Sequence, residues 1–529
     1  MTAAAEPELD LVEPHMLGFL AMLGIDVEYV RAEGNTLWYL DRDGREVPVL
    51  DYAGGYGALV LGHNHPELVA TAKALLESGA PVLAQASLHP YASRVGATLN
   101  RIVQREFPGS EPYFTVFANS GAESVEVATK HAELDRVLRV QALFQAIEAE
   151  AGQARAAVEA GTAAVPAAAY RRLGLPAGDS GAAGFELLLA EVARHNGELA
   201  ARPPLFLTPE GSFHGKLVGS IQLTYNPAFR TPFAAMAAPA RFVPLNQPGA
   251  LAKIVEAERV SALGLAVEDG VVAVVEHDFP LFGAFVLEVI QGEGGIRVVT
   301  EEFAREIEQV CASIDCPIVV DEIQSGLGRT GAFFASSHIG LRADYFTLAK
   351  GLGGGIAKTS ATLIRSGRYR KEFELLHSST FAKDTFSSAL ALKMLELLEA
   401  DGGAAYRLAE QNGARLLALF EALRRDFPAV VKDVRGKGLM LGLEFHDQSD
   451  ATATGIREAA RSETFGYVLS GFLLRAHRIR TFPTASAVNT LRFEPSVQLS
   501  QAEVDQLETA LRDLCAVLER QDEQRLFQG

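Results

Sequence analysis

Two residues with reactive side chains each follow a short apolar run. Asp321 closes the run that begins at Ile318, and Lys350 follows the run that begins at Tyr345. A glycine-rich turn comes after each of them. A lysine with little charge beside it can act as an amine nucleophile in Schiff-base chemistry, and an aspartate can pair with a protonated pyridine nitrogen. The two residues together indicate a pyridoxal phosphate site.

The apolar runs that lead to these residues are continuous and bounded by turn signals. Such runs are typical of strands buried on both faces of a parallel sheet. Open α/β sheets bind their ligands at the carboxyl ends of the strands, where Asp321 and Lys350 would lie. Taken singly, an aspartate at a strand end is more often a cap and a lysine more often a solvated charge. The glycine turns beside both residues reverse that balance.

A long motif carries a resemblance to a known family. The string Asp321-Glu-Ile-Gln-Ser-Gly-Leu-Gly-Arg-Thr-Gly331, followed by Ala349-Lys-Gly351, resembles class III pyridoxal-phosphate aminotransferases of fold type I, a group that includes the ornithine, 4-aminobutyrate and acetylornithine enzymes. The resemblance implies an α/β fold, with a large, mostly parallel sheet domain and a smaller α+β domain built from both chain ends. We therefore expect the N-terminal part of the small domain at 1–84, the large cofactor-binding domain at 85–400, and the C-terminal small domain at 401–529.

The resemblance assigns the cofactor contacts. Lys350 is implied to hold the cofactor and to move the substrate proton, and Asp321 to keep the ring nitrogen protonated. A helix start with small residues can bind phosphate through its free N–H groups and dipole, and an aromatic side chain can stack on a planar ring. The implied cofactor-binding residues are Ser120, Gly121 and Ala122 at the phosphate, Phe213 and His214 at the ring, Gln324 at the ring oxygen, and Thr380 at the phosphate of the neighbouring subunit.

Glu293 and Arg492 are implied to meet in the active site and bind substrate. The planar guanidinium suits a carboxylate, either that of Glu293 or that of a substrate. With Glu293 engaged, the pocket would accept an ω-amine or aldehyde; with Glu293 displaced, Arg492 would bind the α-carboxylate of an amino acid. A permanent structural ion pair is the alternative, since buried carboxylates need partners.

The expected reaction moves an amino group from a donor to a ketone or aldehyde acceptor. The ω-amine type is favoured, and Lys358 with the segment His377-Ser-Ser-Thr-Phe-Ala resembles aminotransferases of natural-product pathways. A pyridoxal-phosphate aminomutase, racemase or decarboxylase of the same fold is the alternative. A metal hydrolase would rest only on scattered histidines such as His63 and His65, and a non-enzymatic relative would lack Lys350 or Asp321.

Two stretches depart from the family pattern or extend it. Residues 131–203 form an Ala- and Glu-rich insertion that we expect to be helical, as a surface ornament or, alternatively, as a lid over the active site. The runs 271–275 and 284–287 are expected to be the next buried strands. Glu288 is followed by Val289 where the family usually has proline.

Composition narrows the classes of function. A chain of 529 residues should hold more than one domain, and a net charge of −18 argues against a broad nucleic-acid or anionic-membrane surface. Three cysteines make neither a disulfide framework nor a set of metal ligands. The first ten residues are acidic, where a signal peptide is basic. No apolar stretch reaches membrane-spanning length. We expect a cytoplasmic homodimer that acts on a small-molecule amino donor and carbonyl acceptor, without metal.

Overall fold

A seven-stranded sheet forms the centre of the computed structural model, which describes residues 13–528. Its strand order is β4-β14-β13-β12-β9-β5-β6. The strands are β4 (Tyr113–Ala118), β5 (Leu205–Pro209), β6 (Ala240–Val243), β9 (Phe282–Leu287), β12 (Ile318–Asp321), β13 (Tyr345–Leu348) and β14 (Ser360–Arg365). Only β14 runs against its neighbours, and the other pairings are parallel. The predicted α/β fold with a mostly parallel sheet is confirmed.

Alternate residues of the central strands face two helix layers. Val319 and Tyr345 pack with Ala128 of α4 (Gly121–Glu159) on one face, while Val320 and Phe346 pack into the large core cluster on the other. All residues of β9, β12 and β13 are buried, which explains their continuous apolar sequences. The helices of this part are α3 (Pro90–Glu106), α4 (Gly121–Glu159), α7 (Pro227–Arg230), α8 (Ala250–Glu258), α9 (Glu301–Ser313), α10 (Phe373–Leu376) and α11 (Thr385–Asp426), with short 3-10 turns at Ser220–Leu223, Thr231–Met236, Ala335–Ile339 and Lys350–Gly353.

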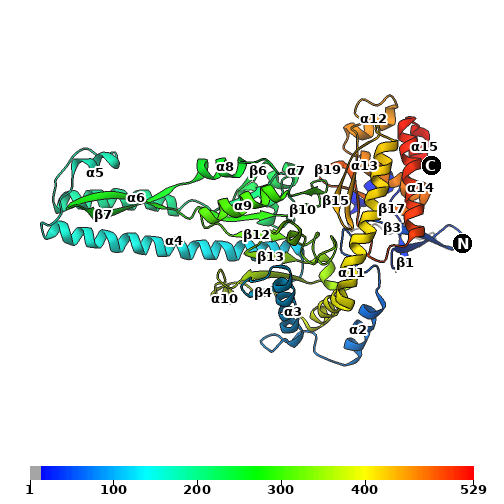
Figure 1. Cartoon of the computed structure of the whole chain (residues 1–529), viewed down its shortest axis with the longest axis horizontal. Coiled ribbons are helices and arrows are strands. Elements are labelled where there is room, and N and C mark those ends of the chain that lie inside the picture. The colour runs from blue at the N-terminus through cyan, green and yellow to red at the C-terminus, as the bar shows by residue number, and fades with distance from the viewer. Residues whose placement is uncertain (1–12, 529) are drawn as a thin grey trace, which may run out of the picture.

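Both chain ends meet in a second region. β3 pairs in parallel with β17, so the N-terminal strands β1, β2 and β3 share a sheet with a C-terminal strand. In Figure 1 the blue N-terminal strands lie beside the orange and red C-terminal elements. The strands of this region are β1 (Tyr29–Glu33), β2 (Thr36–Leu40), β3 (Glu46–Asp51), β15 (Val431–Lys437), β16 (Met440–Phe445), β17 (Ile479–Arg480), β18 (Phe482–Thr484) and β19 (Ala487–Phe493). Its helices are α1 (Pro14–Leu23), α2 (Pro66–Glu77), α12 (Thr454–Arg461), α13 (Phe465–His477), α14 (Gln501–Glu519) and α15 (Glu523–Gln528), and a further short strand pair joins β10 (Ile290–Gln291) to β11 (Arg297–Val298).

An arm projects from the sheet on the side away from these chain ends (Figure 1). We define the arm as residues 148–200 and 261–278; it holds the distal part of α4, α5 (Ala167–Arg172), α6 (Ala182–Ala200), β7 (Ser261–Glu268) and β8 (Val271–Asp278). Its own apolar cluster includes Ala154, Tyr170, Phe185 and Leu188. Most residues of the stretch 131–203 lie in helices α4, α5 and α6.

The prediction for residues 271–275 is wrong in one respect. This run is a strand, but it does not join the main sheet: β8 pairs with β7 in a two-stranded hairpin. Val272 is buried in the arm core whereas Val271 is 40% exposed. The hairpin covers helices α4 and α6 with one face only, so its valines are not a sign of burial on both faces.

The length of α4 separates the arm from the sheet edge. The first arm-core residue, Ala151, comes thirty positions after the start of the helix at Gly121, and at ~1.5 Å per residue this is about 45 Å. In this arrangement the arm is too distant to cover the start of α4.

Among residues 13–528, no helix combines the length and apolar character needed to span a bilayer. The three cysteines are free and buried.

Candidate active site

Lys350 lies just beyond the carboxyl end of β13, in a short 3-10 turn. Its backbone φ is +41°, in the left-handed region that is unfavourable for a residue with a Cβ. The side-chain Nζ donates a hydrogen bond to Oε1 of Gln324 at 2.7 Å. Burial lowers the pKa of Lys350, opposed mainly by the charge of Glu494. A lowered pKa increases the neutral fraction of the amine, which is the nucleophilic form.

Asp321 ends the neighbouring strand, and its side chain is almost fully buried. One carboxylate oxygen accepts hydrogen bonds from the Thr347 hydroxyl at 3.2 Å and the Ile323 N–H at 3.1 Å. The other lies 2.8 Å from Nδ1 of His214, whose Nε2 is 3.3 Å from the Thr208 hydroxyl. A carboxylate can accept about four hydrogen bonds, so Asp321 retains the capacity to bind a protonated ring nitrogen.

The start of α4 forms a cup suited to an anion. Ser120 caps the helix and accepts from the Glu123 N–H, in a reciprocal capping box. The first N–H groups of a helix have no intrahelical acceptor, so those of Gly121 and Ala122 can bind phosphate. The chain after His214 packs directly on this cup, because a Cβ at Gly215 would lie 2.6 Å from the Cβ of Ala122.

Glu288 supports the Phe213 backbone beside this cup. Its two carboxylate oxygens accept from the Phe213 N–H at 2.8 Å and the Gly292 N–H at 3.0 Å. Burial raises the pKa of Glu288 to about 7, with the charge of His214 opposing and that of Asp321 adding to the effect. The carboxyl therefore changes protonation near neutral pH, in direct contact with the segment that carries Phe213 and His214.

Glu293 and Arg492 form a two-pronged ion pair. The guanidinium Nη1 and Nη2 donate to the two carboxylate oxygens at 2.7 and 2.5 Å. Glu293 also accepts from the Ala485 N–H at 2.7 Å, and Arg492 donates to the Pro483 carbonyl at 3.0 Å. Burial opposes ionisation, but the charge and hydrogen bonds of Arg492 lower the pKa of Glu293 below its usual value. The Tyr56 ring lies 4.9 Å from the guanidinium carbon.

The structure brings six of the predicted residues together in three pairs and leaves Thr380 exposed. Direct hydrogen bonds or ion pairs link Lys350 with Gln324, Asp321 with His214, and Glu293 with Arg492. Thr380 is exposed; its carbonyl accepts from Gln85, and the hydroxyl of the preceding residue, Ser379, accepts from Asn119 at 2.8 Å. This places Thr380 near the anion cup and at the surface.

Sequence reasoning missed two members of the site, Tyr56 and Glu494. Tyr56 adopts a φ of +56° in a glycine turn. In the sequence, the glycine residues around it were the signal that could have indicated its place in the site. Glu494 is fully buried and accepts from Gln324 Nε2 at 2.8 Å. In the sequence, the position of this carboxylate two residues after Arg492 and next to an apolar strand was the signal that could have indicated its role.

The histidines near the N-terminus do not make a metal centre. His63 pairs with Asp51 at 2.9 Å, and His65 precedes α2. Across residues 13–528, no group of three or more His, Cys, Asp or Glu side chains is arranged to hold a metal ion.

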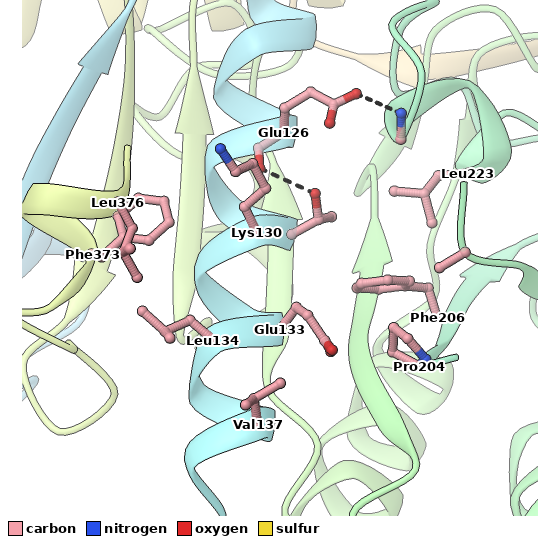
Figure 2. A pocket seen from close by; sticks show the side chains of 13 residues that line it. Glu126, Lys130, Glu133, Leu134, Val137, Pro204, Phe206, Leu223, Phe373 and Leu376 are labelled. Carbon is pink, nitrogen blue, oxygen red and sulfur yellow. Dashed lines mark hydrogen bonds between the residues drawn. The ribbon is translucent and has the colours of Figure 1, made fainter. Parts of the chain in front are cut away.

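An apolar pocket of about 410 Å³ lies apart from Lys350, along the first part of α4. Figure 2 shows Leu134 and Val137 on the helix, with Phe206 on one side and Phe373 and Leu376 on the other. Glu126 at its upper end accepts from the Gly219 and Ser220 N–H groups at 2.7 and 2.8 Å. Glu126 therefore ties the helix to the loop that follows His214.

The side chains and backbone groups gathered around Lys350 fit pyridoxal phosphate. The cup at Gly121 and Ala122 suits its phosphate, Asp321 suits its ring nitrogen, and the desolvated amine of Lys350 suits its aldehyde. Gly215 belongs to this fit, since its φ of +107° and its contact with Ala122 exclude a side chain there.

Comparisons with known proteins agree with this geometry. The profile of the family "Aminotransferase class-III" matches residues 22–513. Among solved structures, an ornithine aminotransferase from Toxoplasma gondii is 22% identical, with a TM-score of 0.63 over 94% of this chain and 92% of that one. An amine transaminase from an uncultivated Pseudomonas species is 19% identical, with a TM-score of 0.66 over 98% and 99% of the two chains. A transaminase from the marine bacterium Virgibacillus is 18% identical, with a TM-score of 0.66 over 94% of each chain.

These likenesses to structures establish the fold, and the family match extends over nearly the whole chain. The chain belongs to the class III aminotransferases, enzymes that use pyridoxal phosphate to transfer amino groups between small molecules.

Proposed function

We propose that this aminotransferase exchanges an amino group between an ω-amine or aldehyde and a second substrate that carries an α-carboxylate. Lys350 is the covalent anchor of the cofactor and the base that moves the substrate proton. Asp321, oriented by His214, keeps the ring nitrogen protonated, and Gln324 contacts the ring oxygen. Ser120, Gly121, Ala122 and Phe213 hold the phosphate and ring. When bound, the cofactor supplies the electron sink that lowers the barrier to proton removal.

The observation that carries the substrate preference is the buried pair of Glu293 and Arg492. Arg492 is 1% exposed, and both its terminal nitrogens are engaged by Glu293. In this state its charge is neutralised, so the pocket suits an amine or aldehyde without an α-carboxylate. Arg492 Nε has no hydrogen-bond partner among the described residues. That spare donor supports the second state, in which Glu293 moves away and Arg492 binds a substrate carboxylate.

The two half-reactions test this switch separately. In Arg492→Ala, the half-reaction with an α-amino acid such as glutamate should slow far more than that with a carboxylate-free amine. A desolvated charge pair lost to substrate costs about 2–5 kcal/mol, so the predicted difference in kcat/KM is at least about 30-fold. Stopped-flow absorbance of the bound cofactor measures each half-reaction. Equal losses would show that Arg492 holds the fold only, as in a permanent ion pair.

A homodimer is part of the proposal, with Thr380 reaching the phosphate of the partner. Large apolar side chains within five residues of Thr380, or of its hydrogen-bond partner Gln85, are open to solvent in the single chain: Leu88 is 95% exposed, Leu375 94%, Leu376 64% and Phe381 61%. Exposed apolar surface of this kind marks an interaction site, and closed two-fold dimers are the commonest assembly. The apolar pocket of Figure 2 continues this surface through Leu376. Light scattering should find a dimer, and an active monomer would contradict it.

The domain division at 84/85 and 400/401 is also proposed. The second boundary coincides with a break in α11, where residues 400–403 leave helical geometry. A cytoplasmic location is supported by the three free cysteines. The proposal places the enzyme in natural-product biosynthesis, supported by the family resemblance of Lys358 and the segment around Thr380.

A further inference from the structure

Glu494 is a fully buried carboxylate that directly follows β19 and contacts Gln324, the hydrogen-bond partner of Lys350. Its backbone N–H donates to the Tyr52 carbonyl at 2.7 Å, which fixes it against an N-terminal glycine turn. In that turn, a Cβ at Gly57 would lie 3.1 Å from Glu494 Oε1 and 3.3 Å from Gln324 Cγ. The turn therefore packs directly on both side chains.

Glu494 determines which end of the Gln324 amide faces Lys350. Gln324 donates from Nε2 to Glu494 at 2.8 Å and accepts at Oε1 from Lys350 Nζ at 2.7 Å. A carboxylate accepts only, whereas the two ends of an amide differ in donor and acceptor character. Nε2 must therefore face Glu494, which leaves Oε1 for the lysine. A Cβ at Gly292 would collide with Oε1, so the amide is confined on that side too.

The second oxygen of Glu494 is unused by the described residues. Within 13–528, Oε2 is buried and has no hydrogen-bond partner. The charged groups with the largest effects on the pKa of Lys350 are Glu494 and Arg492 from β19 and its end, Glu293 after β10, and Glu288 after β9. Among these charges, Glu494 has the largest effect and raises the pKa of Lys350 against the effect of burial.

We propose that Glu494 is a positioning residue for Lys350, which holds the Gln324 carbonyl oxygen toward Nζ and keeps a negative charge beside the amine. The free Oε2 gives the site a buried acceptor that is ready when Nζ carries an extra proton. This inference rests on the proposed role of Lys350 as the cofactor anchor.

The charge of the lysine side chain gives the direct test. In Glu494→Gln the holoenzyme should shift the pH midpoint of its visible absorbance to lower pH by about 1 unit, since an opposite charge at close range changes a pKa by ~1–3 units. After removal of the cofactor, the extent of Lys350 acetylation in the full chain can be measured by mass spectrometry as a function of pH. The pH midpoint of acetylation should also shift to lower pH in Glu494→Gln. Both readouts are independent of turnover.

Glu322→Gln is the matched control, because it removes a fully buried carboxylate two residues from Gln324 that is not among the charges with the largest effects on Lys350. An unshifted Glu494→Gln, or a shift equal to that of the control, would overturn the proposal. If Glu494→Gln does not fold, Glu494→Asp retains the charge but withdraws it from Gln324. It should then give a smaller shift in the same direction, and an unchanged midpoint would overturn the proposal.

The two proposals fail in different ways. If the cofactor is attached elsewhere, borohydride reduction will leave it on a residue other than Lys350. If only the role of Glu494 is wrong, the cofactor will be on Lys350 and the pH midpoints will not move.

Discussion

The two ends of α4 bury different kinds of side chain. Near its N-terminus, the candidate active site buries charged groups such as Asp321 of β12 and Arg492 and Glu494 at the end of β19. At its distal end, the arm buries alanine, leucine and aromatic side chains. The charged groups of the arm pair at the surface, as Arg155 does with Glu186 at 2.8 Å, with 43% and 56% of these side chains exposed.

This difference shows what each region needs for stability. Buried charges are costly unless they are paired and hydrogen-bonded, so the active-site edge depends on the large core beneath it. The arm has an apolar cluster separate from that core. We therefore expect damage to the arm to leave cofactor binding intact, and equal damage below the active-site edge to abolish it.

A matched pair of phenylalanines gives the largest predicted effect. Phe346 in β13 is fully buried and packs on Phe107 and Phe334, whereas Phe185 is buried in the arm core. Either change to alanine should cost about 3–5 kcal/mol where it is made. Phe346→Ala should lose cofactor absorbance, while Phe185→Ala should retain it and open the arm to limited proteolysis. Loss of cofactor in a folded Phe185→Ala protein would support the lid alternative for the insertion.

A smaller effect concerns Glu288 and pH. Burial raises the pKa of this carboxyl from 4.5 to about 7 in the folded state, so between these pH values the folded protein binds more protons than the unfolded chain. Its contribution to the free energy of unfolding should therefore fall as pH rises from about 4.5 to 7, by on the order of 3 kcal/mol.

Glu288→Gln removes this titration. The unfolding free energies of the variant and of the parent protein can be measured by urea unfolding across that pH range. As pH rises, the variant should become more stable relative to the parent. Parallel curves would mean that folding does not raise the pKa of Glu288.

Sequence alone was informative where signals are local. The continuous apolar runs before Asp321 and Lys350 predicted strands of the parallel sheet, because burial on both faces leaves that pattern. The sequence could not show that β8 lies outside the main sheet. The valines at 271–275 form the same apolar pattern as the buried strands, although the β7–β8 hairpin packs only within the arm. Tyr56 and Glu494 come to the site from opposite ends of the chain. Tyr56 contacts Arg492 and Glu494 contacts Gln324, and both contacts depend on long-range packing.

The attachment point of the cofactor tests the central claim most directly. Borohydride reduction of the holoenzyme, followed by peptide mass spectrometry, should place the cofactor on Lys350, and Lys350→Ala should bind it only non-covalently with turnover lowered at least ~10³-fold. Recovery of the adduct on Lys358, the next lysine along the chain, would contradict this account of the site.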